Sequence, residues 1–151
     1  MIKIITVGSI KEKYLKDAID EYTKRLKKYT SIELIEVKDE GLVEESKAIS
    51  LEADKIKKYL NTKDYIITME IEGKLLTSPE FAEKINQIQI ESSNIVFIIG
   101  GSYGLSDEIK NMAKFHMSFS KMTFPHQLFR VLLLEQIYRA FKILNNESYH
   151  K

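Results

Sequence analysis

A short polar segment late in the sequence has the residue types of a binding site. It contains Ser120, Lys121, Thr123, His126 and Gln127, and it lies between a predicted strand and the most apolar predicted helix. Polar groups that leave a buried strand need hydrogen-bond partners, which either the protein or a ligand must supply. We therefore expect a ligand near this segment. A histidine at a helix start is by itself more typical of a cap or of a satisfied surface residue, and His126 is interpreted in that way.

A glycine-rich segment could form a second wall of such a site. Gly100, Gly101 and Gly104 follow the run Asn94–Ile99, which is apolar on both faces. Glycine lets the backbone approach a ligand closely because it has no Cβ atom. The spacing matches neither the dinucleotide fingerprint nor the P-loop, so the glycines alone indicate no more than a tight turn.

The last predicted helix carries charges that its apolar surface does not require. Glu135 and Arg139 have the i,i+4 spacing of an ion pair. Arg130 and Arg139 could each bind phosphate, a ligand for which arginine is well suited. Residues 149–151 then place an aromatic ring, an imidazole and a cation in succession. Such an end is either frayed or able to stack on a base and hold a phosphate.

Alternating strands and helices must position these segments. Apolar runs predict strands over residues 2–7, 31–37, 64–71, 94–99 and 117–120, and helical spacing predicts helices over 13–28, 44–60, 78–89, 106–114 and 125–144. This alternation predicts one α/β domain over residues 1–151, with a largely parallel sheet covered by helices on both faces. Ligands of such sheets bind at the carboxyl ends of the strands, where residues 69–73, 99–104 and 119–126 are expected.

The predicted helix over residues 125–144 is apolar on every side. A helix of this kind must be covered on every side, and one sheet covers only one of them. We therefore expect a symmetric homodimer that forms through this helix. A helix buried between the sheet and other helices of the same chain would satisfy the same pattern.

Composition limits the possible chemistry and location of the protein. The 151 residues contain no cysteine, which excludes disulfides, thiolate catalysis and cysteine-bound zinc. His116, His126 and His150 lack the spacing of metal ligands, so no metal is expected. No apolar run approaches the roughly 20 residues that a bilayer span needs, and the first residues have no apolar signal segment. We expect a cytoplasmic protein with no membrane partner.

Charge is distributed unevenly along the chain, although the net charge is only +1. Residues 1–30 contain eight Lys or Arg and four Asp or Glu, and residues 121–151 contain five and two. Residues 31–120 contain ten Lys or Arg and sixteen Asp or Glu. The two ends therefore carry net charges of +4 and +3, and the centre carries a net charge of −6. If the ends meet in the fold, they form a positive surface. A solvated helix face explains any single lysine equally well.

Seven segments together resemble the RlmH family, the SPOUT-class methyltransferases that act on N3 of a pseudouridine in 23S ribosomal RNA. The segments are Val7–Gly8, Tyr65–Lys74, Phe97–Ser106, Ser118–His126, Arg130–Val131, Glu135–Lys142 and Tyr149–Lys151. The resemblance covers the whole chain. Its most specific parts are Ser120–Gln127, which reads SKMTFPHQ, and the Tyr-His-Lys end.

The resemblance implies a fold and a cofactor site. The C-terminal part would be threaded into a trefoil knot within a homodimer, and the knot loops would hold S-adenosylmethionine. The corresponding positions in this sequence are Met69, Gly100, Phe119, Ser120, Lys121, Met122, Thr123 and Phe124. Many relatives have leucine in place of Met69, an exchange that conserves volume.

The implied substrate is a pseudouridine in helix 69 of 23S rRNA, reached within assembled ribosomes. In-line positioning of a sulfonium methyl provides most of the rate enhancement, but N3 is protonated at neutral pH and its proton needs an acceptor. His150 or Glu135 would be that acceptor, and Tyr149 would stack on the base or orient it. RNA phosphates would be held by Arg130, Arg139 and Lys151.

Two other functions are compatible with parts of the sequence. A ribosome-binding or assembly factor of the same fold would need the basic ends but no turnover. A flavodoxin-like module would bind FMN or ATP, which the glycine segment gives no reason to expect. Saturable binding of S-adenosylmethionine separates the methyltransferase from both.

Overall fold

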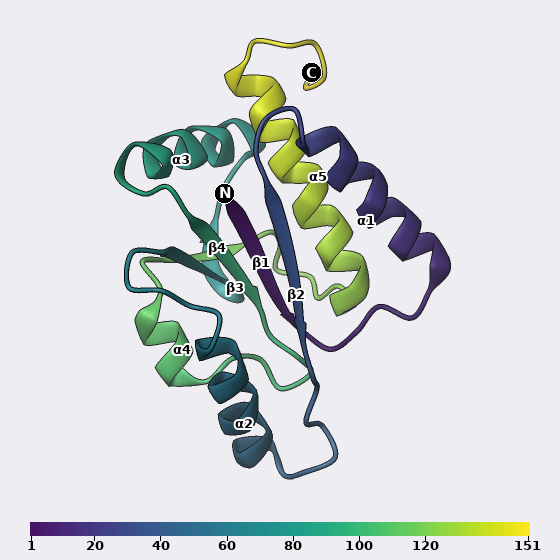
Figure 1. The fold of residues 1–151 in the computed structure, drawn as a ribbon, viewed down its shortest axis with the longest axis vertical. Coiled ribbons are helices and arrows are strands. Elements are labelled where there is room, and N and C mark those ends of the chain that lie inside the picture. The colour runs from purple at the N-terminus through teal and green to yellow at the C-terminus, as the bar shows by residue number, and fades with distance from the viewer.

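Five parallel strands form one sheet in the order β2-β1-β4-β3-β5, and the computed structural model describes all residues from 1 to 151 (Figure 1). The elements along the chain are β1 (Ile2–Val7), α1 (Lys13–Leu26), β2 (Ile32–Val37), α2 (Glu45–Lys57), β3 (Tyr65–Leu75), α3 (Ser78–Glu91), β4 (Ile95–Ile99), α4 (Asp107–Met112), β5 (Phe115–Ser118) and α5 (His126–Leu144). The predicted α/β class and the alternation of strands with helices are confirmed.

The central strand β4 explains why the sheet is buried on both faces. All five of its residues are buried, and it pairs with β1 on one side and β3 on the other. Successive side chains of a strand point to opposite faces, so Phe97 enters one core while Val96 and Ile98 enter the other. A run of β-branched and aromatic residues without polar alternation is typical of such a strand.

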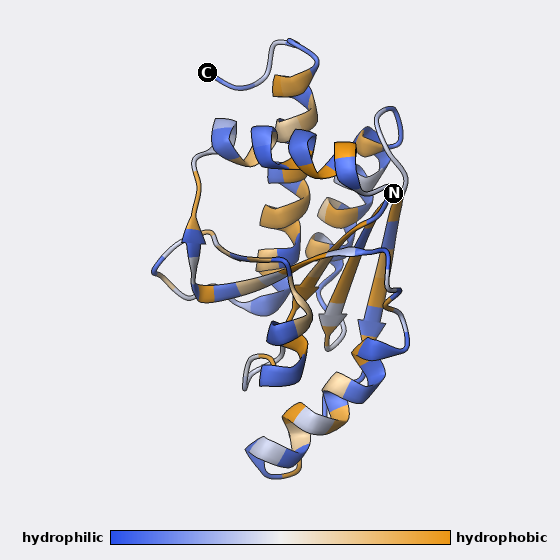
Figure 2. Cartoon of the chain, turned by 90° about the vertical axis from the view of Figure 1, so that its left-hand side faces the viewer, coloured by the Kyte–Doolittle hydropathy of each residue, from blue (hydrophilic) through white to orange (hydrophobic).

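Helices cover the two faces unequally. The larger core joins the sheet to α1, α3 and α5, and the smaller one joins it to α2 and α4 (Figure 1). Helix α5 packs between α1 and α3. Apolar residues occur on its successive turns (Figure 2). The first and second turns keep apolar surface, because Leu128 is 39% exposed and Val131 and Leu132 are only partly buried.

The start of α3 is fixed by a cap one residue before the predicted helix over residues 78–89. The N-cap is Thr77, and Pro79 lies in the first turn. The Thr77 hydroxyl accepts from the backbone N–H of Glu80 (3.2 Å), and the Glu80 carboxylate accepts from the backbone N–H of Thr77 (2.8 Å). This reciprocal capping box satisfies two backbone donors. It leaves the Ser78 hydroxyl free to donate to Gln136 on α5 (2.8 Å).

Strand β3 is longer than predicted and contains an irregularity. Met117 of β5 lies opposite both Met69 and Lys74, so the intervening residues leave the ladder and the strand resumes up to Leu75. Gly73 reads as a strand end in the sequence, yet it lies inside the strand. A Cβ atom at Gly73 would lie 2.5 Å from the carbonyl carbon of Met117, and only glycine permits this approach.

Strand β5 lies two residues earlier than predicted. The predicted range was 117–120, whereas the observed strand is Phe115–Ser118. Phe119 and Ser120 therefore belong to the loop before α5. None of the helices combines the length and the apolarity that a membrane span requires.

Candidate active site

A cavity of about 350 Å³ opens at the carboxyl ends of β3, β4 and β5. Its walls are the irregular part of β3, the glycine segment after β4 and the loop between β5 and α5. Seven of the eight residues predicted for the cofactor site line it: Met69, Gly100, Phe119, Ser120, Met122, Thr123 and Phe124. Lys121 does not. The position at the strand ends is the one that an open α/β sheet provides for ligands.

Met69 is the point where the three strand ends meet. It lies opposite Ile99 on β4 and opposite Met117 on β5. The segment that leaves the ladder after it turns Glu70, Ile71 and Glu72 toward the cavity. The irregularity in β3 therefore builds one wall of the site.

Gly100 and Gly104 form a second wall that tolerates no side chain at position 100. A Cβ atom there would lie 2.7 Å from the carbonyl carbon of Gly104. Gly104 has a φ of +80°, a conformation that favours glycine, and its N–H donates to the carbonyl of Gly101 (3.0 Å). The tight turn predicted for these glycines is present, and it also exposes backbone to the cavity.

The loop before α5 supplies an aromatic wall. The rings of Phe119 and Phe129 lie 4.9 Å apart, and Phe124 stacks on Phe129 at 6.4 Å. Ser120 is used within the loop: its hydroxyl accepts from the N–H of Met122 (3.0 Å). Aromatic and apolar side chains facing exposed backbone groups suit a ligand with a flat ring and polar substituents, such as a nucleoside.

A charged cluster at the edge of the cavity was missed by the sequence analysis. The carboxylate of Glu70 accepts from the hydroxyl of Thr68 (2.6 Å), pairs with Nδ1 of His116 and lies 3.6 Å from Nζ of Lys110. Burial alone would raise the pKa of Glu70, but the hydrogen bonds from Thr68 and His116 outweigh it and lower the pKa below its usual value. Thr68 and Glu70 share one strand face, and this i,i+2 spacing of polar residues could have revealed the cluster.

His126 lines the cavity from the first turn of α5. Burial lowers its pKa, and the neighbouring charge of Arg130 lowers it further. The imidazole is therefore neutral at physiological pH. It makes no side-chain cap hydrogen bond at the start of α5 and is exposed, so of the two interpretations of His126, a helix cap or a surface residue, only the second fits.

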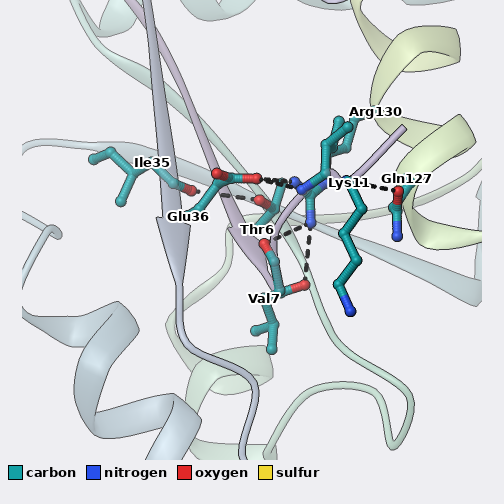
Figure 3. A network of polar contacts seen from close by, with 9 residues as sticks. Thr6, Val7, Lys11, Ile35, Glu36, Gln127 and Arg130 are labelled. Carbon is teal, nitrogen blue, oxygen red and sulfur yellow. Dashed lines mark hydrogen bonds and ion pairs between the residues drawn. The ribbon is translucent and has the colours of Figure 1, made fainter. Parts of the chain in front are cut away.

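Arg130 lies in a buried network that joins α5 to the ends of β1 and β2 (Figure 3). Its guanidinium donates to the carboxylate of Glu36 (2.6 Å) and to the carbonyl oxygens of Gly8 (2.8 Å) and Val7 (3.2 Å). The side chain is only 6% exposed. The predicted phosphate contact has no accessible donor here, and the structure gives Arg130 partners within the chain.

The four residues predicted to act on the RNA side of the reaction form a second network, which joins the middle of α5 to the end of the chain. The carboxylate of Glu135 accepts from Nε of Arg139 (3.1 Å) and from the hydroxyl of Tyr149 (3.1 Å). Nη1 of Arg139 lies 3.2 Å from Nδ1 of His150. Burial, followed by the contact with Glu135, raises the pKa of Tyr149 to about 12, so this phenol is protonated at neutral pH. The predicted ion pair is confirmed, and Tyr149 and His150 contact side chains of α5.

This network does not line the main cavity of its own chain. Glu135 lies nine residues after His126, about 14 Å further along α5. It borders a smaller cavity of about 270 Å³, which shares Met117, Phe119 and Phe124 with the main one. The two sites are neighbours separated by an aromatic wall.

Comparison with known proteins gives a consistent picture. A family model described as "Predicted SPOUT methyltransferase" matches residues 1–150. A protein of Methanococcus maripaludis is 55% identical over 99% of both chains. Proteins of Clostridium botulinum and Clostridium acetobutylicum, both named ribosomal RNA large subunit methyltransferase H, are 50% and 48% identical over 99% of both chains. A solved structure from Haemophilus influenzae has a TM-score of 0.57 at 19% identity, over 99% of this chain and 70% of that one, and is similar in fold.

Proposed function

The chain belongs to the SPOUT methyltransferase family, and from this premise we propose that it methylates ribosomal RNA of the large subunit with S-adenosylmethionine as the donor. More specifically, we propose that the acceptor is N3 of a pseudouridine in helix 69 of 23S rRNA, within assembled ribosomes. The relatives at about half identity carry the name of a large-subunit RNA methyltransferase. The observation that carries the proposal is the cavity at the ends of β3, β4 and β5.

The residues of this cavity fit a nucleoside that bears a positive charge. Met69, Phe119 and Phe124 offer apolar surface for a flat ring, and the cradle of Gly100 and Gly104 brings backbone within reach of it. The lining includes two carboxylates, those of Glu70 and Glu72, but only one ammonium group, that of Lys110. An excess of negative charge attracts a cationic ligand. S-adenosylmethionine, when bound, supplies an electrophilic methyl group on a sulfonium.

The network on α5 and the tail has the groups that the RNA side of the reaction requires. The attacking nitrogen carries a proton at neutral pH, and Glu135 and His150 are the two candidate acceptors. Tyr149, held by Glu135, presents an aromatic ring for stacking on a base. Arg139 and Lys151 are cations for phosphate, and Arg139 also lies beside His150.

A homodimer would bring these two half-sites together. The network does not open onto the cavity of its own chain, and apolar residues near the start of α5 (Leu128, Val131 and Leu132) keep exposed or partly exposed surface. We propose that a second copy covers this surface and that the tail of one copy faces the cavity of the other. The site is incomplete in one chain alone.

Binding and transfer assays with the purified protein test the proposal. Titration calorimetry should show saturable binding of S-adenosylmethionine, and a radioactive methyl group should pass from it to 23S rRNA in large subunits or assembled ribosomes. Ribosome binding without cofactor binding would contradict the proposal and identify a non-catalytic assembly factor instead. Transfer to protein or to small-subunit RNA would contradict the proposed substrate.

A further inference from the structure

Helix α5 ends in a turn that sends the chain back toward α1. Asn146 has a φ of +54°, the left-handed conformation that commonly ends a helix. Its N–H donates to the carbonyl of Ile143 (3.1 Å), and the N–H of Glu147 donates to the carbonyl of Lys142 (2.9 Å). These two hydrogen bonds define a Schellman motif. The turn places Glu147 beside both helices.

The side chain of Glu147 is held by three donors, one on α5 and two in the turn that follows α1. One carboxylate oxygen accepts from the hydroxyl of Tyr29, which follows α1 (2.7 Å). The other accepts from Nζ of Lys142 on α5 (2.9 Å) and from Nζ of Lys28 (3.2 Å). Two of the donors are cations, and hydrogen bonds between ionised groups are stronger than neutral ones. The carboxylate is 28% exposed, so this contact is partly shielded from solvent.

Two of the donors, Tyr29 and Lys142, pack against aromatic rings. Tyr29 stacks on Phe141 of α5 at 5.6 Å and meets Tyr138 edge-on at 6.3 Å. Nζ of Lys142 lies 5.4 Å from the centre of the Tyr138 ring. Aromatic packing and cation–π contacts restrict these side chains before Glu147 binds them. Tyr29 and Lys142 are therefore held in positions from which they can bind the carboxylate of Glu147.

The residues just after Glu147 are the ones that complete the proposed active site. Tyr149 lies edge-on to Tyr138 at 5.0 Å and donates to Glu135, and His150 reaches Arg139. A short chain end without an anchor loses these contacts readily, because ordering each residue costs conformational entropy. Glu147 is the anchor nearest to them.

We infer that Glu147 is a positioning residue: its carboxylate binds Lys28, Tyr29 and Lys142 and thereby holds Tyr149 and His150 against Glu135 and Arg139. Glu147 does not itself touch the substrate. The effect on catalysis rests on the proposed function, whereas the effect on the order of the chain end does not.

The substitution Glu147→Gln in the full-length protein tests the inference. It keeps the size of the side chain but removes the charge that the two lysines bind. NMR relaxation of the backbone amides of residues 148–150 should give order parameters near about 0.85 in the unchanged protein and below about 0.6 in E147Q. The value of kcat for methyl transfer should fall about tenfold, while the Kd for S-adenosylmethionine stays within about twofold.

Two further variants make the comparison specific. Ser148→Ala changes the next residue, whose side chain makes none of these contacts, and it should match the unchanged protein in both measurements. Tyr29→Phe keeps the aromatic ring and removes one hydrogen-bond donor to Glu147. It should therefore lower the order parameters of residues 148–150, although none of those residues is substituted. Its kcat should fall less than that of E147Q.

The results that would overturn the inference are distinct from those that would overturn the function. Unchanged order parameters in E147Q would show that Glu147 does not hold the chain end. If the order parameters of residues 148–150 fell in E147Q but kcat stayed unchanged, Glu147 would anchor the chain end without positioning the active site. A lack of methyl transfer by the unchanged protein would overturn the proposed function, and order parameters that fall in E147Q would still support the anchoring.

Discussion

Individual residues determine the shape of the cavity. Gly100 cannot carry a side chain without displacing Gly104, whose backbone forms the same wall. Seven of the eight predicted cofactor residues meet at this cavity although they come from three separate segments. The resemblance could identify them because its motifs are local. Glu70, Lys110 and His116 were missed because their contacts join distant parts of the sequence.

Replacing Gly100 with valine should abolish binding of S-adenosylmethionine. The new side chain would push the backbone of Gly104 into the cavity, and we expect the Kd to rise at least about 100-fold, or about 2.7 kcal/mol. Titration calorimetry measures this directly. Gly41→Ala is a matched control, because a Cβ atom there meets only the side chain of Asp39. Equal affinity of G100V and the unchanged protein for S-adenosylmethionine would show that the cofactor does not bind in this cavity.

Replacing Arg130 with methionine should destabilise the fold rather than weaken RNA contacts. The carbonyls of Val7 and Gly8 would lose their donor, and we expect the free energy of unfolding to fall by about 2–4 kcal/mol in urea titrations. The exposed Arg25→Met should leave the free energy of unfolding nearly unchanged. The salt dependence of RNA binding should be the same in R130M. If the slope of the logarithm of the binding constant against the logarithm of the salt concentration were smaller by about one in R130M, Arg130 would bind a phosphate.

At the scale of elements, the strength of the local pattern decided what could be predicted. The apolar run of β4 and the spacing of α5 gave correct elements, because burial on both faces leaves a clear signal. Strand β5 has four residues, lies at the sheet edge and includes a polar His116, so its position was wrong by two residues. The continuation of β3 past Gly73 depends on a close approach to Met117, which no local pattern reveals.

The chain end after α5 should loosen in acid but not at neutral pH. Hydrogen bonds from Lys142 and Tyr29, with a further one from Lys28, lower the pKa of Glu147 to about 2 from the usual 4.5. A carboxylate whose pKa is depressed by folding stabilises above its unfolded pKa, and the stabilisation is lost as pH falls through the folded value. The NMR order parameters of residues 148–150 should therefore stay constant at neutral pH and fall between about 4.5 and 2.

The variant E147Q is the control for this titration, because it lacks the titrating group. Its order parameters should already be low at neutral pH and should show no step in acid. Amides of β4, measured in the same samples, report whether the whole protein unfolds. A step of equal size in E147Q and in the unchanged protein would assign the acid response to another group.

At the scale of the whole molecule, the N-terminal and C-terminal regions lie side by side. Lys28 after α1 and Lys142 of α5 both bind Glu147, so the two basic ends do meet in the fold, which was the condition for a shared positive surface. Part of their positive charge is neutralised at that point, which composition could not show. The trefoil knot and the homodimer implied by the resemblance stay predictions.

Mixing two inactive variants tests whether two copies share one site. G100V lacks the cavity, and a variant truncated after Ser148 lacks Tyr149 and His150. If sites are shared, about half of the dimers formed from an equal mixture are mixed, and each has one intact site, so about a quarter of full activity should return. No recovery after subunit exchange, in a mixture shown by mass spectrometry to contain mixed dimers, would place the whole site within one chain.

The most direct measurement is mass mapping of 23S rRNA from cells that lack this protein and from the same cells supplied with it. We expect one methyl group, on N3 of a pseudouridine in helix 69, to be absent in the first and restored in the second. G100V should not restore it. An identical methylation pattern in both cell lines, or restoration by G100V, would contradict the claim that this cavity delivers a methyl group to ribosomal RNA.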